Sequence, residues 1–158
     1  MTTSLDPNTF GEGQPCFGCS PDHPTGLRLR FERDGEWVRT RFSPGDAHQG
    51  PPGIMHGGLV TTLADEVAAW AIIGVLGKFG FTAQMRAKLL KPVRVGAEVL
   101  GRSRVAKDTG RTVTVEVFLA QSGEDVYKGE FTFVLVDRTG AERLLGGPLP
   151  AAWERFLR

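Results

Sequence analysis

The sequence predicts an α+β fold in which a curved antiparallel sheet wraps around one long central helix. Residues 57–76 form an apolar stretch of helical length, and four strand-like segments follow it, with glycine-containing turns between the last three. A helix that is apolar on almost every face is expected to be buried at the centre of a domain. A sheet curved around that helix would bury it.

The chain before the helix predicts an arm and a hairpin. Residues 1–25 are rich in Gly, Pro, Ser and Asp and lack periodicity, so we expect an irregular arm. Apolar and charged residues alternate over 27–32, which is typical of a strand. Arg33-Asp34-Gly35 is a turn signal, and residues 36–42 supply a second strand. A loop over 43–55, with three prolines and three glycines, leads into the helix.

The second half of the chain predicts an antiparallel meander. Thr109-Gly110 and Ser122-Gly123 mark tight hairpin turns, and Lys91-Pro92 separates the first strand from the second. The strands are expected over 81–90, 97–107, 111–121 and 125–137. Together with the preceding elements they outline the hotdog architecture.

Length and charge limit the classes of protein. A chain of 158 residues predicts one domain over 26–140, with a tail over 141–158 that contains a short helix near its end. A net charge of +1 gives no preference for nucleic acid or a membrane surface. We count no uninterrupted apolar run long enough to span a bilayer and find no signal peptide, and therefore expect a cytoplasmic protein.

Two adjacent carboxylates interrupt the helix. Asp65 and Glu66 are the only charged residues between Gly57 and Gly77. Burying an unpaired carboxylate costs several kcal/mol, roughly. Such a costly group is a candidate for catalysis, and a buried ion pair is the structural alternative.

The residues around the helix start resemble PaaI-type acyl-CoA thioesterases of the hotdog superfamily. His56-Gly57-Gly58 is followed by an acidic residue, Asp65, nine positions after the histidine. The matching features cover roughly residues 16–136 and include Cys16-Phe17-Gly18-Cys19, Thr25-Gly26-Leu27, His48-Gln49-Gly50, Gly53-Ile54-Met55, Lys91-Pro92-Val93 with Gly96, and Gly110-Arg111.

The resemblance implies roles for four residues. Asp65 would act as general base or nucleophile, and the Gly57 amide would stabilise the oxyanion. His56 would hold the turn or orient a substrate, and Thr82 would support the attacking water, unless Thr82 is an ordinary strand residue. Some relatives carry an asparagine before the His-Gly-Gly motif, where this chain has Gln49 or Gly50, which leaves open how the water is held.

The chemistry of thioester hydrolysis fits these residue types. A carboxylate in a partly desolvated site gains basicity, and amides at a helix N-terminus stabilise an oxyanion. Gly57 and Gly58 have no side chains, so a carbonyl can approach their amides closely. In many relatives the acid and the oxyanion donor come from two subunits. The resemblance therefore implies a homodimer, commonly paired into a dimer of dimers.

Other residues receive weaker assignments. Glu66 would orient a water, pair with a basic residue from another strand, or reach solvent at a dimer seam. Lys91 and Arg111, at turns that match the family pattern, are candidates for the phosphates of coenzyme A. An acyl pocket would be lined by Trp70, Phe79, Phe81 and Met85, unless these residues belong to the core or to a subunit interface.

Cys16 and Cys19, with His23 four residues later, suggest zinc at first sight. A structural zinc site needs four protein ligands, and the only other histidines are His48 and His56. We interpret this segment as packing of the arm, expect no bound metal or cofactor, and keep zinc as the alternative.

The predicted function is hydrolysis of an acyl-CoA thioester to a carboxylic acid and coenzyme A. The alternative is a non-catalytic acyl-CoA-binding hotdog protein, which an amide or alanine in place of Asp65 would favour. No hydratase-type motif is present. The acyl chain, and acyl-CoA against acyl carrier protein as the donor, stay open.

Overall fold

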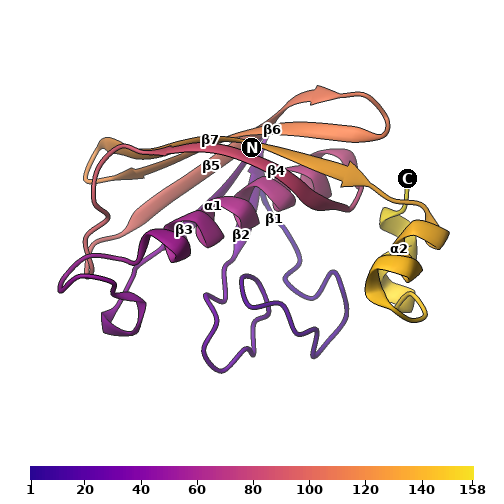
Figure 1. Ribbon diagram of the computed structural model, residues 1–158, viewed down its shortest axis with the longest axis horizontal. Coiled ribbons are helices and arrows are strands. Elements are labelled where there is room, and N and C mark those ends of the chain that lie inside the picture. Colours follow the sequence, from indigo (N-terminus) through magenta and orange to yellow (C-terminus); the bar gives the residue numbers. More distant parts are fainter.

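A computed structural model describes all 158 residues and confirms the predicted fold. One antiparallel sheet of seven strands, in the order β1-β2-β3-β5-β6-β7-β4, lies over a single long helix (Figure 1). The strands are β1 (Thr2–Ser4), β2 (Phe31–Asp34), β3 (Trp37–Phe42), β4 (Gly80–Leu89), β5 (Val99–Asp108), β6 (Thr112–Gln121) and β7 (Glu124–Leu135).

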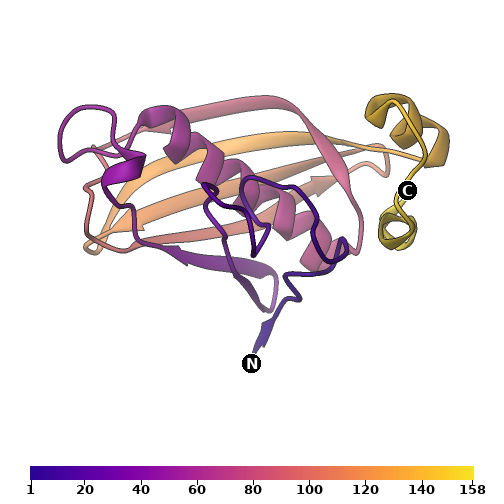
Figure 2. The same cartoon turned by 90° about the horizontal axis from the view of Figure 1, so that it is seen from below.

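The helix α1 spans Gly57–Ala71 and continues through a π-helical turn, η2 (Ile72–Leu76), to Gly77. Gly77 ends it in the left-handed conformation, at φ +63°, which a residue with a side chain adopts at a cost. In Figure 2 the helix crosses one face of the sheet, and the N-terminal arm passes over the helix on the side away from the sheet.

The core lies between α1 and the sheet. The Trp70 ring stacks on Phe31 of β2 with centroids 4.7 Å apart. Gly101 of β5 lets the helix approach, because a Cβ there would lie 2.9 Å from Val67. The buried hydroxyl of Ser103 donates to the Val67 carbonyl at 2.7 Å. These contacts fix the rotation of α1, and hence the direction in which its carboxylates point.

The turns of the meander are as predicted, with Gly110 and both residues of Ser122-Gly123 at positive φ. The first predicted strand is wrong in its start. Leu27 and Leu29 are buried as expected, but their amides donate to the carbonyls of Phe17 and Gly18 in the arm. Arg28 lies at φ +50°, so pairing within the sheet starts only at Phe31.

Each end of the chain carries an element that the sequence did not predict, β1 at the N-terminal end and α2 at the C-terminal end. β1 adds to the edge of the sheet beside β2. Helix α2 (Arg138–Leu145) starts at Asp137, whose side chain accepts from the Gly140 amide. The expected short helix of the tail is a 3-10 helix, η3 (Ala151–Phe156).

By length and composition, residues Gly57–Leu76 would also be sufficient to cross a membrane. The sequence-based statement that no segment is long enough is therefore too strong. About half of this stretch is buried inside the fold, where it forms the centre of the core.

β4 is an edge strand with an unusual exposure. It pairs with β7 only, and every residue from Ala83 to Leu89 is exposed. Among the exposed side chains are Met85 and Leu89, which are 50% and 55% accessible. An edge strand with exposed apolar side chains is open to pairing with another chain.

Candidate functional site

Asp65 meets Thr82 between α1 and β4. The Thr82 hydroxyl donates to Asp65 Oδ1 at 2.7 Å, across 17 residues of sequence. The second oxygen, Oδ2, makes no hydrogen bond within the chain and is free to accept a proton. Desolvation raises the pKa of Asp65 above its ordinary value, and the hydrogen bond from Thr82 opposes that rise. The arrangement is a fixed carboxylate of increased basicity.

A cavity of about 210 Å³ opens beside this pair. Two-thirds of its wall residues are hydrophobic, and the arm, α1, β4 and the C-terminal segment all contribute to it. The lining residues include Phe10, Trp70, Phe79, Phe81, Phe133 and Trp153. Three of the four predicted pocket residues lie here; Met85 does not, because it sits on the exposed part of β4.

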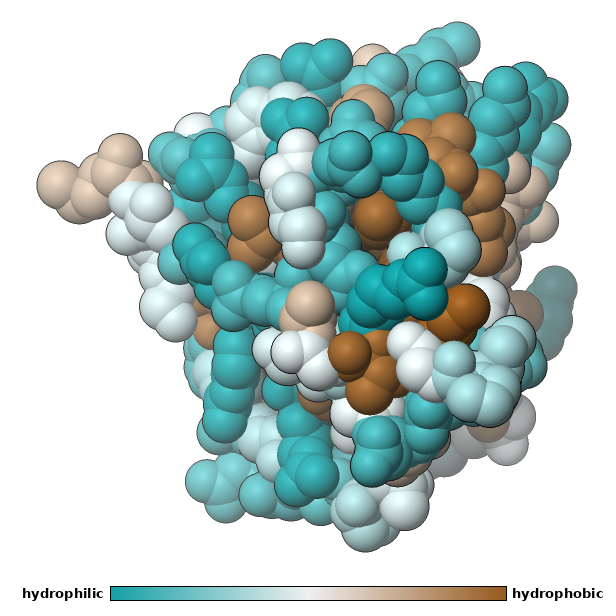
Figure 3. All heavy atoms as spheres, turned by 90° about the vertical axis from the view of Figure 1, so that its left-hand side faces the viewer, coloured by the Kyte–Doolittle hydropathy of each residue, from teal (hydrophilic) through white to brown (hydrophobic).

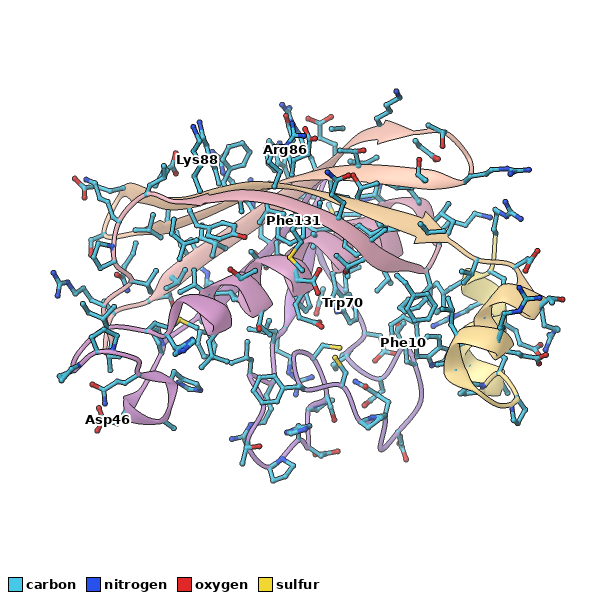
Figure 4. All side chains as sticks on the ribbon, in the orientation of Figure 1. Phe10, Asp46, Trp70, Arg86, Lys88 and Phe131 are labelled. Atoms are coloured by element: carbon cyan, nitrogen blue, oxygen red, sulfur yellow. The ribbon has the colours of Figure 1, made fainter.

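The Phe10 ring closes the cavity against Trp70. Figure 4 shows Phe10 of the arm below Trp70 of the helix. Arg86 and Lys88 lie on the opposite side of the molecule, on the outer face of the sheet. The Phe10 ring lies 4.9 Å from Trp153 and 5.6 Å from Phe79. The arm and the tail therefore form one aromatic wall of the cavity.

The two glycine amides at the start of α1 differ in their hydrogen bonding. His56 is the N-cap, and its Nδ1 accepts from the Gly58 amide at 3.0 Å. As the first residue of the helix, Gly57 has no intrahelical acceptor, and its amide makes no hydrogen bond in the chain. Gly57 is also exposed. The free donor is thus Gly57, and the position of His56 fits an orienting residue.

Gly57 and Asp65 of one chain are too far apart to act on one carbonyl. Eight residues of helix separate them, which is about 12 Å along the axis at 1.5 Å per residue. A groove beside Gly57 is lined by Val60, Leu89, Leu90 and Lys91, and it is distinct from the cavity beside Asp65. Figure 3 views the molecule from the side at which α1 begins, where several apolar patches reach the surface.

Glu66 points to the arm, and its partner is a cysteine rather than a basic residue, which was one of the three expected alternatives. The Cys16 thiol donates to Glu66 Oε1 at 3.3 Å, and no salt bridge of the chain includes Glu66. Desolvation raises the pKa of Glu66 to about 8. The hydrogen bond from Cys19 lowers the pKa of Cys16 to about 5.

The two candidate phosphate-binding residues lie apart. Lys91 borders the groove beside Gly57 and pairs with Glu124, which follows the end of β6. Arg111 precedes β6 at its other end and makes no salt bridge. A strand of ten residues is about 33 Å long, so one coenzyme A phosphate group cannot reach both in one chain.

The segment that carries these residues is similar in sequence to known proteins. The family model of the Thioesterase superfamily matches residues 52–127, a range that includes Gly57, Asp65 and Thr82. A methylthioribose-1-phosphate isomerase of Aquifex aeolicus is 34% identical over 86 residues, which cover 54% of this chain and 18% of that protein. The acyl-coenzyme A thioesterase THEM4 of Xenopus laevis is 27% identical over 95 residues, covering 60% and 42%. The chain thus spans less than half of either relative.

Solved structures share the fold. A crystal structure of a thioesterase superfamily protein superimposes with a TM-score of 0.72 and 25% identity, covering 83% of this chain and 69% of that one. A hypothetical thioesterase of Streptococcus pneumoniae, solved with coenzyme A, gives a TM-score of 0.61 and 25% identity, covering 65% and 82%. The predicted resemblance to hotdog thioesterases is confirmed.

Proposed function

We propose that this hotdog-fold chain is a member of the thioesterase superfamily and that it hydrolyses acyl-CoA thioesters to a carboxylic acid and free coenzyme A. The observation that carries the proposal is the Asp65–Thr82 pair at the wall of an apolar cavity. The coenzyme A bound to the Streptococcus pneumoniae thioesterase and the name of the Xenopus laevis relative support the same substrate class.

In the proposed reaction the acyl chain occupies the cavity and its thioester carbonyl lies at Asp65. The free Oδ2 takes a proton from water, and the oxygen of that water bonds to the carbonyl carbon. The tetrahedral intermediate then breaks its carbon–sulfur bond and releases the coenzyme A thiolate, which regains a proton. Asp65 as direct nucleophile gives the same products through an anhydride that water opens.

The oxyanion donor comes from a second copy of the chain. The roughly 12 Å between Gly57 and Asp65 excludes a complete site within one chain. Exposed β4 offers the surface for a second copy, and its last residue, Leu89, lies beside Gly57. We propose a homodimer in which Gly57 of one protomer donates to the oxyanion formed at Asp65 of the other. Two such dimers would form the tetramer.

Thiol release from a panel of acyl-CoAs tests the activity. The panel runs from acetyl to palmitoyl and includes phenylacetyl and benzoyl groups, and the released thiol is measured with a colorimetric reagent. Turnover of at least one member supports the proposal. Saturable binding of acyl-CoA without turnover would replace it with a binding function.

A further inference from the structure

Three potential metal ligands converge where the arm meets α1. The ligand atoms of Cys16, Cys19 and Glu66 all lie within 4.8 Å of one another. Cys16 Sγ and Glu66 Oε1 are 3.3 Å apart. Cys16 and Glu66 are 50 positions apart in sequence, and the proposed reaction uses none of the three residues.

The spacing suits a tetrahedral zinc ion. Zinc binds thiolate at about 2.3 Å and carboxylate oxygen at about 2.0–2.2 Å, so two ligand atoms of a tetrahedron lie roughly 3.6–3.8 Å apart. The 3.3 Å between Cys16 Sγ and Glu66 Oε1 lies just below that range, and no pair of ligand atoms in the cluster is more than 4.8 Å apart. A site with two thiolates and one carboxylate favours zinc over the hard cations magnesium and calcium, which prefer oxygen ligands throughout.

No cationic side chain forms a salt bridge with the acidic group of this cluster. Two cysteines and a carboxylate share a desolvated position, and no lysine, arginine or histidine forms a salt bridge with Glu66. Buried charges in proteins are paired or coordinate metals. Here the nearest polar partner of Glu66 is the Cys16 thiol alone.

We propose that Cys16, Cys19 and Glu66 bind one zinc ion, which ties the N-terminal arm to α1 and leaves a fourth coordination position open to the cavity. All three residues line the cavity that also holds Asp65 and Thr82. Three protein ligands with one open position are the arrangement in which zinc keeps a water or exchangeable ligand. The site departs from our sequence-based expectation that no metal binds.

The surroundings of the sulfur atoms support this assignment. The Cys19 amide donates to Cys16 Sγ at 3.4 Å, and Gln14 Nε2 donates to Cys19 Sγ at 3.7 Å. Such donors stabilise thiolates and orient metal ligands. Gly18, between the cysteines, permits the approach, because a Cβ there would lie 2.1 Å from Glu66 Cγ.

Zinc content and cobalt spectroscopy of the full chain test the proposal without reference to catalysis. We expect one zinc per chain in protein purified under reducing conditions, and one equivalent of Co²⁺ in metal-free protein to give sulfur-to-cobalt charge-transfer absorption. Cys16→Ser and Cys19→Ser should lose that absorption. Glu66→Gln should weaken zinc binding on the order of tenfold or more.

His23→Gln is the matched control, since His23 lies outside the cluster and its Nδ1 accepts from the Thr25 amide. It should bind zinc as wild type does. Circular dichroism verifies that each variant is folded, and Glu66→Gln preserves the size of the side chain. Reduced wild type that binds no zinc overturns the proposal, as does a folded Glu66→Gln variant with unchanged affinity. Loss of zinc in His23→Gln with retention in Glu66→Gln would move the site to Cys16, Cys19 and His23 and would also overturn it.

Discussion

The Thr82 hydroxyl donates to Asp65 Oδ1 at 2.7 Å and leaves Oδ2 without a hydrogen bond, and both residues line the cavity. The two residues belong to elements that the core positions separately, α1 and β4. Their contact fixes the direction of the only α1 carboxylate that no cysteine engages. Four variants and one mixing experiment follow from this geometry.

Thr82→Val keeps the shape of the side chain and removes the donor. It should lower kcat/KM about tenfold, less than the roughly 10²–10⁴-fold that a general base itself contributes. The hydrogen bond lowers the pKa of Asp65, so its loss raises that pKa. Activity depends on ionised Asp65, so the acid limb of the pH profile should move to higher pH. Thr82→Ser, which keeps the hydroxyl, is the control. An unchanged acid limb in Thr82→Val would separate Thr82 from the reaction.

Gly57→Pro should remove the oxyanion donor and preserve the helix. Proline is tolerated at the first helical position, where the amide has no intrahelical acceptor, and His56 at φ −57° and ψ 130° suits a residue before proline. We expect kcat to fall about 10²–10³-fold.

Gly57→Ala keeps the amide and serves as the control, although its Cβ would lie 3.3 Å from the flexible Leu89 side chain. Thermal melts should show both variants folded. Wild-type turnover in Gly57→Pro would mean that another group stabilises the oxyanion.

Mixing two inactive variants tests the composite site. A heterodimer of Asp65→Asn and Gly57→Pro chains has one intact site, formed by Asp65 of one chain and Gly57 of the other. After mixing at equal amounts and exchange of subunits, about one quarter of wild-type activity should return, since half of the dimers then hold one intact site of two. Each variant alone supplies the baseline. No recovery despite verified exchange would contradict a site shared between Asp65 of one chain and Gly57 of the other.

Phe10→Ala should enlarge the cavity and loosen the arm. The side chain is 8% exposed and contacts four aromatic rings, so its truncation should cost about 3–5 kcal/mol of unfolding free energy. The preferred acyl group should become longer or bulkier in the thiol-release panel. Phe10→Leu, with a smaller loss of volume, should lie between wild type and Phe10→Ala. An unchanged preference in a folded Phe10→Ala protein would place the acyl chain elsewhere.

Local pattern was sufficient to predict the centre of this fold. Signals a few residues long predict the apolar helix over 57–76, the alternating strands, and the turns at Gly110 and Ser122-Gly123. The structure confirms all of these elements. The prediction that one face of residues 27–31 is buried was also right. The prediction that this whole segment is a strand of the sheet was wrong, because alternation of apolar residues indicates burial and cannot distinguish pairing with an arm from pairing with a sheet.

In the candidate site too, local sequence predicts some features, and others depend on contacts between distant segments. Asp65 stands out because charge within an apolar helix is costly, and the structure brings Thr82 to it. The partner of Glu66 lies 50 residues away in a segment without periodicity, so no local signal identifies Cys16. Lys91 and Arg111 look equivalent as basic residues at turns, and only the sheet register reveals that they lie at opposite ends of β6.

Asp65→Asn, assayed for thiol release against the best acyl-CoA, tests the central claim most directly. The amide keeps the size of the side chain and its contact with Thr82 but cannot take a proton from water or attack the carbonyl. Asp137→Asn is the control, since asparagine also caps a helix and Asp137 lies outside the cavity. We predict that kcat falls about 10²-fold or more in Asp65→Asn and stays at the wild-type value in the control. A folded Asp65→Asn protein with wild-type kcat would contradict the account.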